Sequence, residues 1–371
     1  YNEILRDKSI NNMKNLNFFK TVTSTIKEGT NENQKIIDIS VEEKPTGEIT
    51  AGAGVGTSGN TLGFGVRENN FLGRGIGLNS NIEFSTESIK GRFNVNNPNF
   101  LNSDKSVYTS IEAQEIDKLT DYGYKTNKTG FLFGTNFEYL DDFRVGIGTS
   151  NFYEKIETDA SASRNMRRQE GDYWDSFANF SFDLDKRNQK FQTTDGYRSL
   201  YYLNVPFVSD TNTLKNTYNY KYFAELYEEN ITTFSVYLSA ANSLSNDNVK
   251  LSERLNVPSD KLRGFEFGKV GPKDGADFIG GNYVSTLNLS STLPNCLENA
   301  QNTDFLFFID AANIWGVDYD SSIDNSNQIR SSIGLGLDWF TPVGPLSFSI
   351  SQPLTKAASD QTESFRFNLG T

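Results

Sequence analysis

Apolar and polar side chains alternate along most of this chain with a period of two. In residues 46–57, TGEITAGAGVGT, one face carries Ile49, Ala51, Ala53 and Val55, and glycines occupy the other. The far end of the chain repeats the pattern, with apolar side chains at Phe365, Phe367 and Leu369. Successive side chains of a strand point to opposite faces, so the alternation predicts strands with one apolar and one polar face.

The pattern predicts about sixteen strands, an even number, separated by turns rich in Gly, Asn, Asp and Pro. Their expected starts lie near residues 47, 61, 75, 88, 106, 123, 142, 172, 197, 216, 231, 281, 304, 328, 345 and 361. Short turns such as TPVGP alternate with long connections at about 155–171, 245–279 and 316–327. Such alternation of short and long connections is typical of bacterial outer-membrane barrels.

Two architectures explain one-sided strands: a soluble sandwich with apolar faces inward, or a membrane barrel with apolar faces outward. The polar faces favour the barrel, because they carry charged residues of both signs, including Arg92, Arg144, Arg330 and Arg366. Strands of about ten residues fit a tilted bilayer span. Aromatic residues crowd the segment ends, as interfacial girdles do. We therefore expect an all-β, sixteen-stranded antiparallel transmembrane barrel over residues 46–371.

The first 45 residues differ from the rest. Residues 3–16 predict a helix, and two strands follow around the polar turn TNEN. A unit of this size cannot bury a full core by itself, which predicts the C-terminal part of a small α+β domain.

The composition argues against several classes of function. The 371 residues hold 35 Lys and Arg against 47 Asp and Glu, a net charge of −12 that argues against a nucleic-acid partner. The chain has no histidine and one cysteine, Cys296, expected in a short turn. The commonest general base and metal ligand is thus missing, and we expect neither an enzyme, nor a metal site, nor a cofactor. Gly54-Val-Gly56-Thr-Ser-Gly59 imitates a dinucleotide motif, but a strand follows it where a helix is required.

Several motifs resemble the BamA family of the POTRA-plus-barrel superfamily. NLNFFKTVTSTIKEG and KIIDISVEEKP resemble the second half of a POTRA domain, and GAGVGTSGNTLGFGVRENNFLGRG resembles the first barrel hairpin. Later matches follow in order: NPNF, TTDGYR, LRGF at 262–265, FIDAANIW and DWFTPVGPLSFSISQPL. The resemblance covers essentially the whole chain and implies that residues 1–45 end the last POTRA domain.

The resemblance also implies a function. Members of this family reside in the bacterial outer membrane, with their POTRA side in the periplasm, and fold and insert β-barrel clients. The implied partners are unfolded outer-membrane proteins, accessory lipoproteins, periplasmic chaperones and outer-membrane lipid. A polypeptide-secretion or translocation channel of the same superfamily remains the alternative.

Two groups of residues are candidate sites. In this family a long loop, here about 245–279, folds into the lumen and docks an arginine on the wall. The resemblance assigns this docking to Leu262, Arg263, Gly264 and Phe265, with Asp310 as partner and Asn288 where the family often has a second acid. That departure predicts weaker charge pairing. The alternative is a solvated Arg263, as most surface ion pairs are weak.

The other candidate site is the seam between the first and last strands. Glycine packs nothing in a strand and weakens its pairing, so an edge containing Gly52, Gly54 and Gly56 could open as a lateral gate. Phe365, Phe367 and Leu369 form the opposite edge. Alternatively, the inward glycines only make room for the loop.

Overall fold

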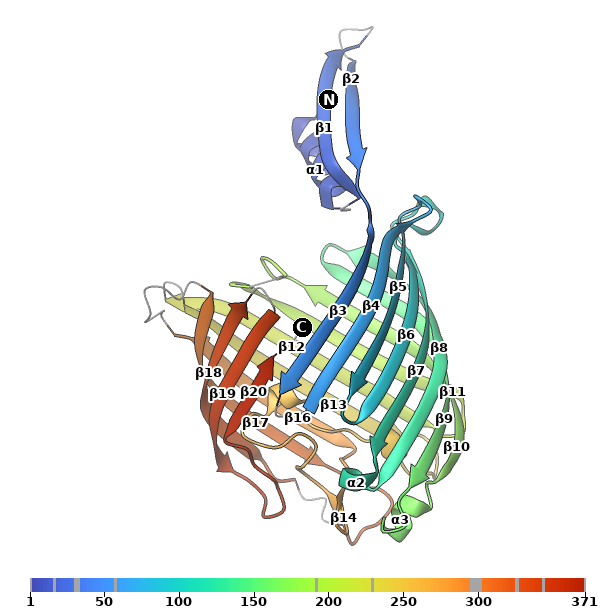
Figure 1. The fold of residues 1–371 in the computed structure, drawn as a ribbon, viewed down its shortest axis with the longest axis vertical. Helices are drawn as coiled ribbons and strands as arrows, with labels where there is room; N and C mark the ends of the chain where they lie inside the picture. The colour runs from blue at the N-terminus through green and yellow to red at the C-terminus, as the bar shows by residue number, and fades with distance from the viewer. Residues whose placement is uncertain are drawn as a thin grey trace.

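The computed structural model describes residues 2–15, 18–29, 34–56, 59–190, 193–227, 230–293, 302–323, 327–341 and 344–369. Cys296 lies outside these residues. Most of the described chain forms one closed barrel of sixteen strands, and every neighbouring pair is antiparallel (Figure 1). The predicted sixteen-stranded antiparallel barrel is therefore confirmed.

The sixteen strands follow one another around the barrel in chain order, and the last strand, β20, pairs with the first, β3, to close it. Their bounds are β3 (Gly47–Gly56), β4 (Gly59–Phe71), β5 (Ile76–Ser85), β6 (Ser88–Asn97), β7 (Ser106–Lys118), β8 (Tyr124–Leu140), β9 (Phe143–Thr158), β10 (Gly171–Asp185), β11 (Gly196–Ser209), β12 (Thr213–Tyr227), β13 (Asn230–Ser243), β16 (Tyr283–Thr292), β17 (Thr303–Trp315), β18 (Arg330–Thr341), β19 (Gly344–Thr355) and β20 (Phe365–Leu369).

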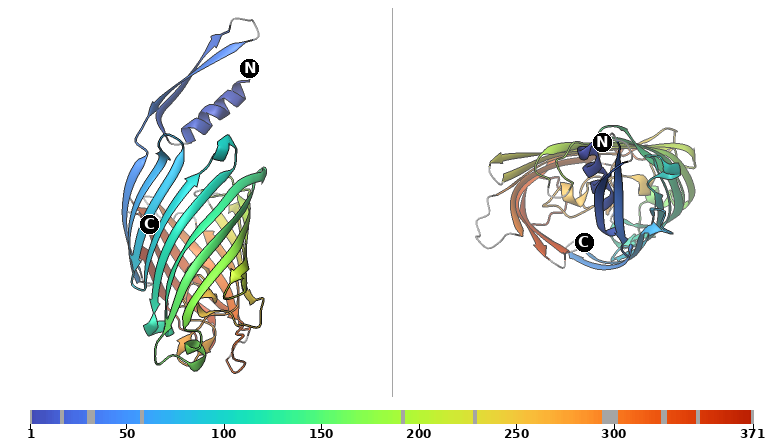
Figure 2. Two further views of the ribbon diagram at one scale, coloured as in Figure 1. Left: turned by 90° about the vertical axis from the view of Figure 1, so that its right-hand side faces the viewer. Right: turned by 90° about the horizontal axis from the view of Figure 1, so that it is seen from above.

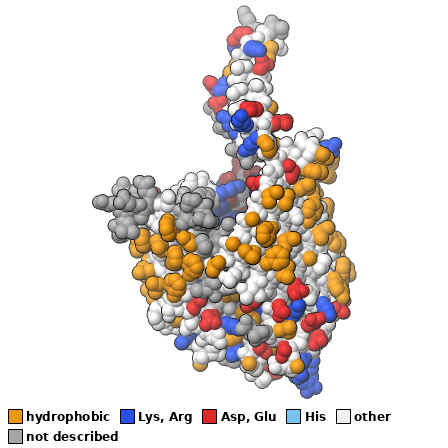
Figure 3. Space-filling view, viewed as in Figure 1, with side chains coloured by type: hydrophobic (Ala, Val, Ile, Leu, Met, Phe, Trp, Pro, Cys, Tyr) orange, Lys and Arg blue, Asp and Glu red, His pale blue; other side chains and the backbone are white. Residues whose placement is uncertain are grey.

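The apolar faces of the strands point outward. On β4, for example, Leu62, Phe64 and Val66 are each more than half exposed. Figure 3 shows hydrophobic side chains spread over the barrel wall, while charged side chains gather towards its ends. The buried apolar clusters instead form around the long connection between β13 and β16. An apolar exterior is what a lipid-facing barrel requires and is the opposite of a sandwich.

Charged side chains on the polar faces pair across neighbouring strands inside the barrel. Arg198 on β11 binds Asp183 on β10 through two nitrogens, each 2.8 Å from a carboxylate oxygen. Arg92 and Glu112 likewise pair between β6 and β7 at 2.7 Å. These pairs satisfy charges that face the lumen.

The N-terminal segment stands off one end of the barrel. It consists of α1 (Glu3–Asn15) and a hairpin of β1 (Phe19–Glu28) and β2 (Lys35–Glu43), with Ile10 and Val22 buried. The opposite end carries the short helices α2 (Leu119–Tyr122) and α3 (Arg164–Arg167) and the β14 (Lys273–Asp274) and β15 (Asp277–Phe278) pair (Figure 1). We call this opposite end the loop end. No helix in the described ranges is long and apolar enough to cross a membrane.

Three short 3-10 helices complete the described structure: η1 (Phe100–Asn102), η2 (Leu251–Glu253) and η3 (Ser259–Lys261). The clearest departure from the sequence expectation is the last strand. It was expected to begin near residue 361 but begins at Phe365.

Candidate functional sites: the docked loop and the barrel seam

The connection between β13 and β16, residues 244–282, folds into the barrel. Figure 2 shows it inside the ring of strands when the barrel is viewed from above. Leu262 and Phe265 are only 3% and 1% exposed, and they pack with Val284 of β16 and Ile314 of β17. Burial of two large apolar side chains against the wall favours this placement over a solvated loop. We call residues 259–271 of this connection the docked loop.

Arg263 lies between these two residues in the sequence, and its side chain faces Asp310 on the inner side of β17. Its Nε and Nη2 donate to the two carboxylate oxygens of Asp310 at 2.8 Å each, and its backbone N–H donates to Oδ2 at 3.1 Å. The guanidinium also lies over the Phe308 ring, 3.4 Å from its centre. Asp310 is fully buried. A two-pronged pair of this kind fixes orientation as well as charge.

Asn288 sits on β16 directly opposite Asp310. Its Nδ2 donates to Asp310 Oδ1 at 2.9 Å and to the backbone carbonyl of Lys261 at 2.7 Å. Its own oxygen accepts from Thr286 at 3.2 Å. The Asn288 amide therefore donates hydrogen bonds both to the Asp310 carboxylate on the neighbouring strand and to the docked loop. An ionised carboxylate at position 288 could accept hydrogen bonds but could donate none.

Gly264 allows the turn to approach the wall. Its φ of +92° is a conformation that other residues adopt only with strain, and a Cβ there would lie 3.2 Å from side-chain atoms of Ser332 and Ser351. Ser332 donates from β18 to the carbonyl of Arg263. Residues of the barrel wall on β16, β17 and β18 thus each form a hydrogen bond with the docked loop.

A second buried ion cluster ties the same connection to the barrel nearer the loop end. Lys250, 1% exposed at its side chain, lies 2.7 Å from Glu154 of β9 and 2.5 Å from Asp175 of β10. Burial lowers the pKa of Lys250, but Glu154, Glu253 and Asp175 outweigh it and hold that pKa above its usual range. The ammonium therefore stays charged between its two carboxylate partners.

The seam joins β20 to β3. Among the described residues, the pairing consists of Asn368 with Gly56 and Leu369 with Val55. Gly52 and Gly54 face Gly63 and Thr61 of β4, on the other side of β3. On β20, Phe365 is half exposed and the Phe367 ring stacks on Phe348 of β19 at 5.2 Å. Of the three candidate glycines, the structure thus places Gly56 in register with β20.

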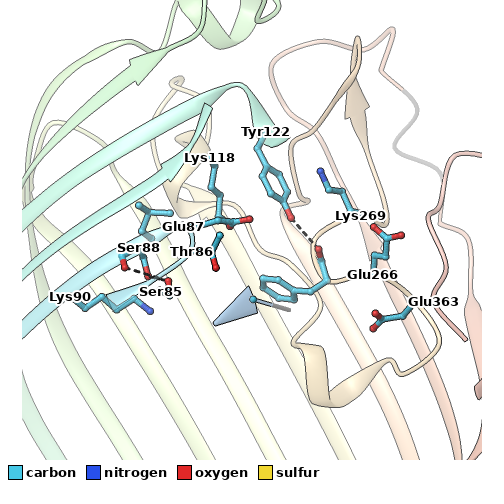
Figure 4. Close-up of a pocket in the computed structure, with 13 residues that line it drawn as sticks. Ser85, Thr86, Glu87, Ser88, Lys90, Lys118, Tyr122, Glu266, Lys269 and Glu363 are labelled. Carbon is cyan, nitrogen blue, oxygen red and sulfur yellow. Dashed lines mark hydrogen bonds between the residues drawn. The ribbon is translucent and has the colours of Figure 1, made fainter. Parts of the chain in front are cut away.

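A cavity of about 700 Å³ lies beside the seam at the loop end. The docked loop forms one side through Glu266, Phe267 and Lys269, and the tips of the early strands form the other (Figure 4). Tyr122 of α2 reaches across and donates its hydroxyl to the Phe267 carbonyl at 3.0 Å.

The Omp85 superfamily domain matches residues 70–371, which is most of the chain. The chain belongs to the Omp85 superfamily. Within this superfamily it is similar to the outer membrane protein assembly factor BamA of Neorickettsia risticii, with 24% identity over 96% of this chain and 49% of that protein. The chain thus spans about half the length of the curated relatives it matches.

Two solved structures share the fold. The crystal structure of Haemophilus ducreyi BamA lacking POTRA domains 1–3 superposes with a TM-score of 0.85, at 22% identity, over 98% of this chain and 77% of that one. CdiB from Escherichia coli superposes less well, with a TM-score of 0.63 at 14% identity, over 99% of this chain and 71% of that one. At these identities the likeness concerns the fold.

Sequence reasoning named Arg263, Asp310 and Asn288, and the structure brings them together. It did not single out Lys250, Glu154 or Asp175, or assign a partner to Arg366. Alternation placed Arg366 on the polar face, but no local pattern indicates what a lumen-facing residue will touch.

Proposed function

We propose that this chain is the membrane barrel of an assembly factor that folds and inserts β-barrel clients into the outer membrane through the seam between β3 and β20. The observation that carries the proposal is the combination of an occupied lumen with a closing strand, β20, that joins the barrel ladder only from Phe365 onward. A lumen occupied by the docked loop suits a passive pore poorly. An edge strand that can be uncovered is a template for an incoming strand.

The proposed mechanism uses strand pairing. When the seam opens, unpaired N–H and C=O groups of β3 bind the first strand of a client, and further client strands add in turn. Each added strand satisfies its backbone groups before its apolar face enters the lipid, which is the condition for crossing a bilayer. The driving force is hydrogen-bond pairing and burial of apolar surface, so the work needs no cofactor and no catalytic residue.

The inward position of Gly52, Gly54 and Gly56 would keep this edge weakly held, because glycine adds no side-chain packing to a strand. Room for the docked loop remains a second use for the same glycines.

The N-terminal segment supports the rest of the proposal. The segment is a helix beside a two-stranded hairpin, with Ile10 and Val22 buried. The C-terminal part of a POTRA domain would contribute such a unit, and we therefore propose that residues 1–45 belong to one. The barrel, residues 46–371, then spans the outer membrane, with this segment in the periplasm and the loop end outside. The proposed partners are unfolded clients, periplasmic chaperones, accessory lipoproteins and lipid.

Reconstitution tests the proposal. The full-length protein in liposomes is mixed with a urea-unfolded outer-membrane barrel, and the folded fraction is followed by the heat-dependent gel mobility of the client. Faster folding than in protein-free liposomes is expected. Ion conductance without faster folding would contradict the proposal and favour the channel alternative.

A further inference from the structure

Arg366 is the inward-facing charged residue of the closing strand. It lies opposite Ser349 of β19, and its side chain is 13% exposed. Its Nη2 donates to the Phe265 carbonyl at 2.7 Å, and its Nη1 donates to the Ser259 carbonyl. These carbonyls flank the Leu262–Gly264 turn, so one guanidinium on β20 holds both sides of the docked turn.

A neighbouring acid fixes the direction of this guanidinium. Glu363 accepts from Arg366 Nε at 2.5 Å, and both side chains are mostly buried. Charge-assisted hydrogen bonds of this kind are stronger than neutral ones, and the planar fork of arginine can serve three acceptors at once. A lysine could not reproduce that arrangement.

The segment that leads into β20 is bonded to the docked loop as well. Glu363 N–H donates to the Gly264 carbonyl at 3.2 Å, and Glu266 N–H donates to the Gln361 carbonyl at 3.1 Å. Gln361 N–H in turn donates to the Lys269 carbonyl at 3.0 Å. Residues 361–363 therefore follow the docked loop instead of the barrel ladder, which explains the late start of β20.

The contacts of the docked loop are distributed unevenly about the seam. On the β20 side it makes the hydrogen bonds just described. On the β3 side it faces the cavity that separates it from Gly59, Thr86 and Lys90 (Figure 4). Contact across that space comes from Tyr122, through its bond to Phe267 and its ring beneath Lys269 at 4.6 Å, and from the Lys118 ammonium, 5.8 Å from the centre of the Phe267 ring.

We propose that Arg366 is a positioning residue that couples the docked state of the loop to the position of β20 at the seam. While Arg263 is seated on Asp310, the Ser259 and Phe265 carbonyls are fixed, and through them Arg366 holds β20. When the turn leaves the wall, the same bonds no longer hold β20 to the barrel. That this coupling serves client insertion rests on the proposed function. The existence of the coupling does not depend on that function.

Hydrogen exchange of the β20 amides measures the coupling directly in the full-length protein in lipid nanodiscs. Arg366→Gln removes the charged fork and should speed exchange in residues 365–369 by about tenfold or more, the effect of one lost hydrogen bond or slightly more. Arg198→Gln is the matched control, because Arg198 makes the same kind of inward ion pair on β11 and should leave β20 unchanged. Arg366→Lys should fall between Arg366→Gln and the parent protein.

The link to docking is tested with Arg263→Ala. If Arg366 carries the influence of the turn, Arg263→Ala should also speed β20 exchange, and adding Arg366→Gln should change it little further. Independent, multiplying effects of the two substitutions would overturn the coupling. Unchanged β20 exchange in Arg366→Gln, or equal exchange in Arg366→Lys and the parent, would overturn the role of the fork. Hydrogen exchange is measured without a client protein. The experiment can therefore disprove the coupling while the proposed insertion function stands, and the coupling can hold even if the insertion function is disproved.

Discussion

Asn288 and Asp310 face each other across β16 and β17, and the Asn288 amide donates to the Asp310 carboxylate at 2.9 Å. The same nitrogen reaches the Lys261 carbonyl of the docked loop at 2.7 Å. The wall therefore presents one negative charge to Arg263, oriented by a neutral donor. The family pattern led us to expect a weaker charge pair at this position. Asn288 instead orients the Asp310 carboxylate and the docked loop through its hydrogen bonds.

Asn288→Asp should loosen the docked loop. A carboxylate at 288 would face both Asp310 and the Lys261 carbonyl without a proton to donate, and two anions would share one guanidinium. Losing these bonds costs about 1–3 kcal/mol, so protease cleavage within residues 245–279 should accelerate roughly tenfold or more. Asn79→Asp, on the lumen face of β5, makes the same charge change away from this site and should leave cleavage unchanged. Equal cleavage in both variants would refute the role given to Asn288.

Arg263→Ala should release the turn without unfolding the barrel. It leaves Asp310 buried without its ion-pair partner, a change that costs about 3–5 kcal/mol, while the strand ladder stays intact. We expect unchanged strand content by circular dichroism, faster cleavage of the loop and fewer assembled client barrels. Arg198→Ala is the control, since it breaks the pair with Asp183 on another part of the wall.

Adding Asp310→Ala to Arg263→Ala should cause little further loss, because the two residues act as one pair. Normal client assembly by both single variants would show that the pair is dispensable for assembly.

Locking the seam should stop insertion while leaving the barrel folded. Val55→Cys with Leu369→Cys places two thiols at positions in register across β3 and β20, and Cys296→Ser removes the competing thiol. Each ladder hydrogen bond contributes only about 1 kcal/mol net, so a short pairing can open, whereas a disulfide cannot. Client folding should cease on oxidation and resume on reduction. A passive channel would conduct equally in both states.

A second cysteine pair controls for the effect of oxidation itself. Leu335→Cys with Ile350→Cys joins β18 to β19, which are in register in the continuous part of the wall. Oxidation there should not slow insertion. If the β3–β20 disulfide also leaves the insertion rate unchanged, the seam is not the client's entry point.

Asp318 should make the loop end sensitive to acid. It lies after β17 and accepts from Val249 N–H at 2.9 Å and from Arg254. Burial by itself raises the pKa of Asp318, but the Val249 N–H and the Arg254 charge outweigh it and hold the pKa below its usual value. A lowered pKa contributes stability that is present above the unfolded value of about 4 and lost as pH falls through the folded value.

Exchange protection of residues 245–256, corrected for the intrinsic pH dependence, should therefore hold from pH 7 to about 5 and fall below about 4. Asp318→Asn should start lower at pH 7 and lack this acid step. An unchanged acid step in Asp318→Asn would assign it to another carboxylate.

The sequence predicted the strands well because alternation is a local property. The expected starts near 75 and 197 correspond to Ile76 and Gly196. The last strand was misplaced because residues 361–363 bond the docked loop, and that contact joins segments about a hundred residues apart, which no local period records.

The docking pair was a different case. Composition alone left Arg263 as an ordinary loop arginine, and resemblance supplied its partner. The Lys250 cluster had no such guide: Glu154 and Asp175 are typical lumen carboxylates in sequence, and only the fold brings them within 3 Å of one ammonium.

The wall that receives Arg263 also bears on how this protein itself folds. Asn288, Asp310 and Ser332 lie on three successive strands that follow the loop closely in the chain, whereas β3 and β20 are separated by almost its whole length. Contacts between nearby segments form with less loss of chain entropy than contacts between distant ones. The turn can therefore dock on β16, β17 and β18 early in folding. The strands at the two ends of the sheet, β3 and β20, would then pair around a lumen that already contains the docked loop.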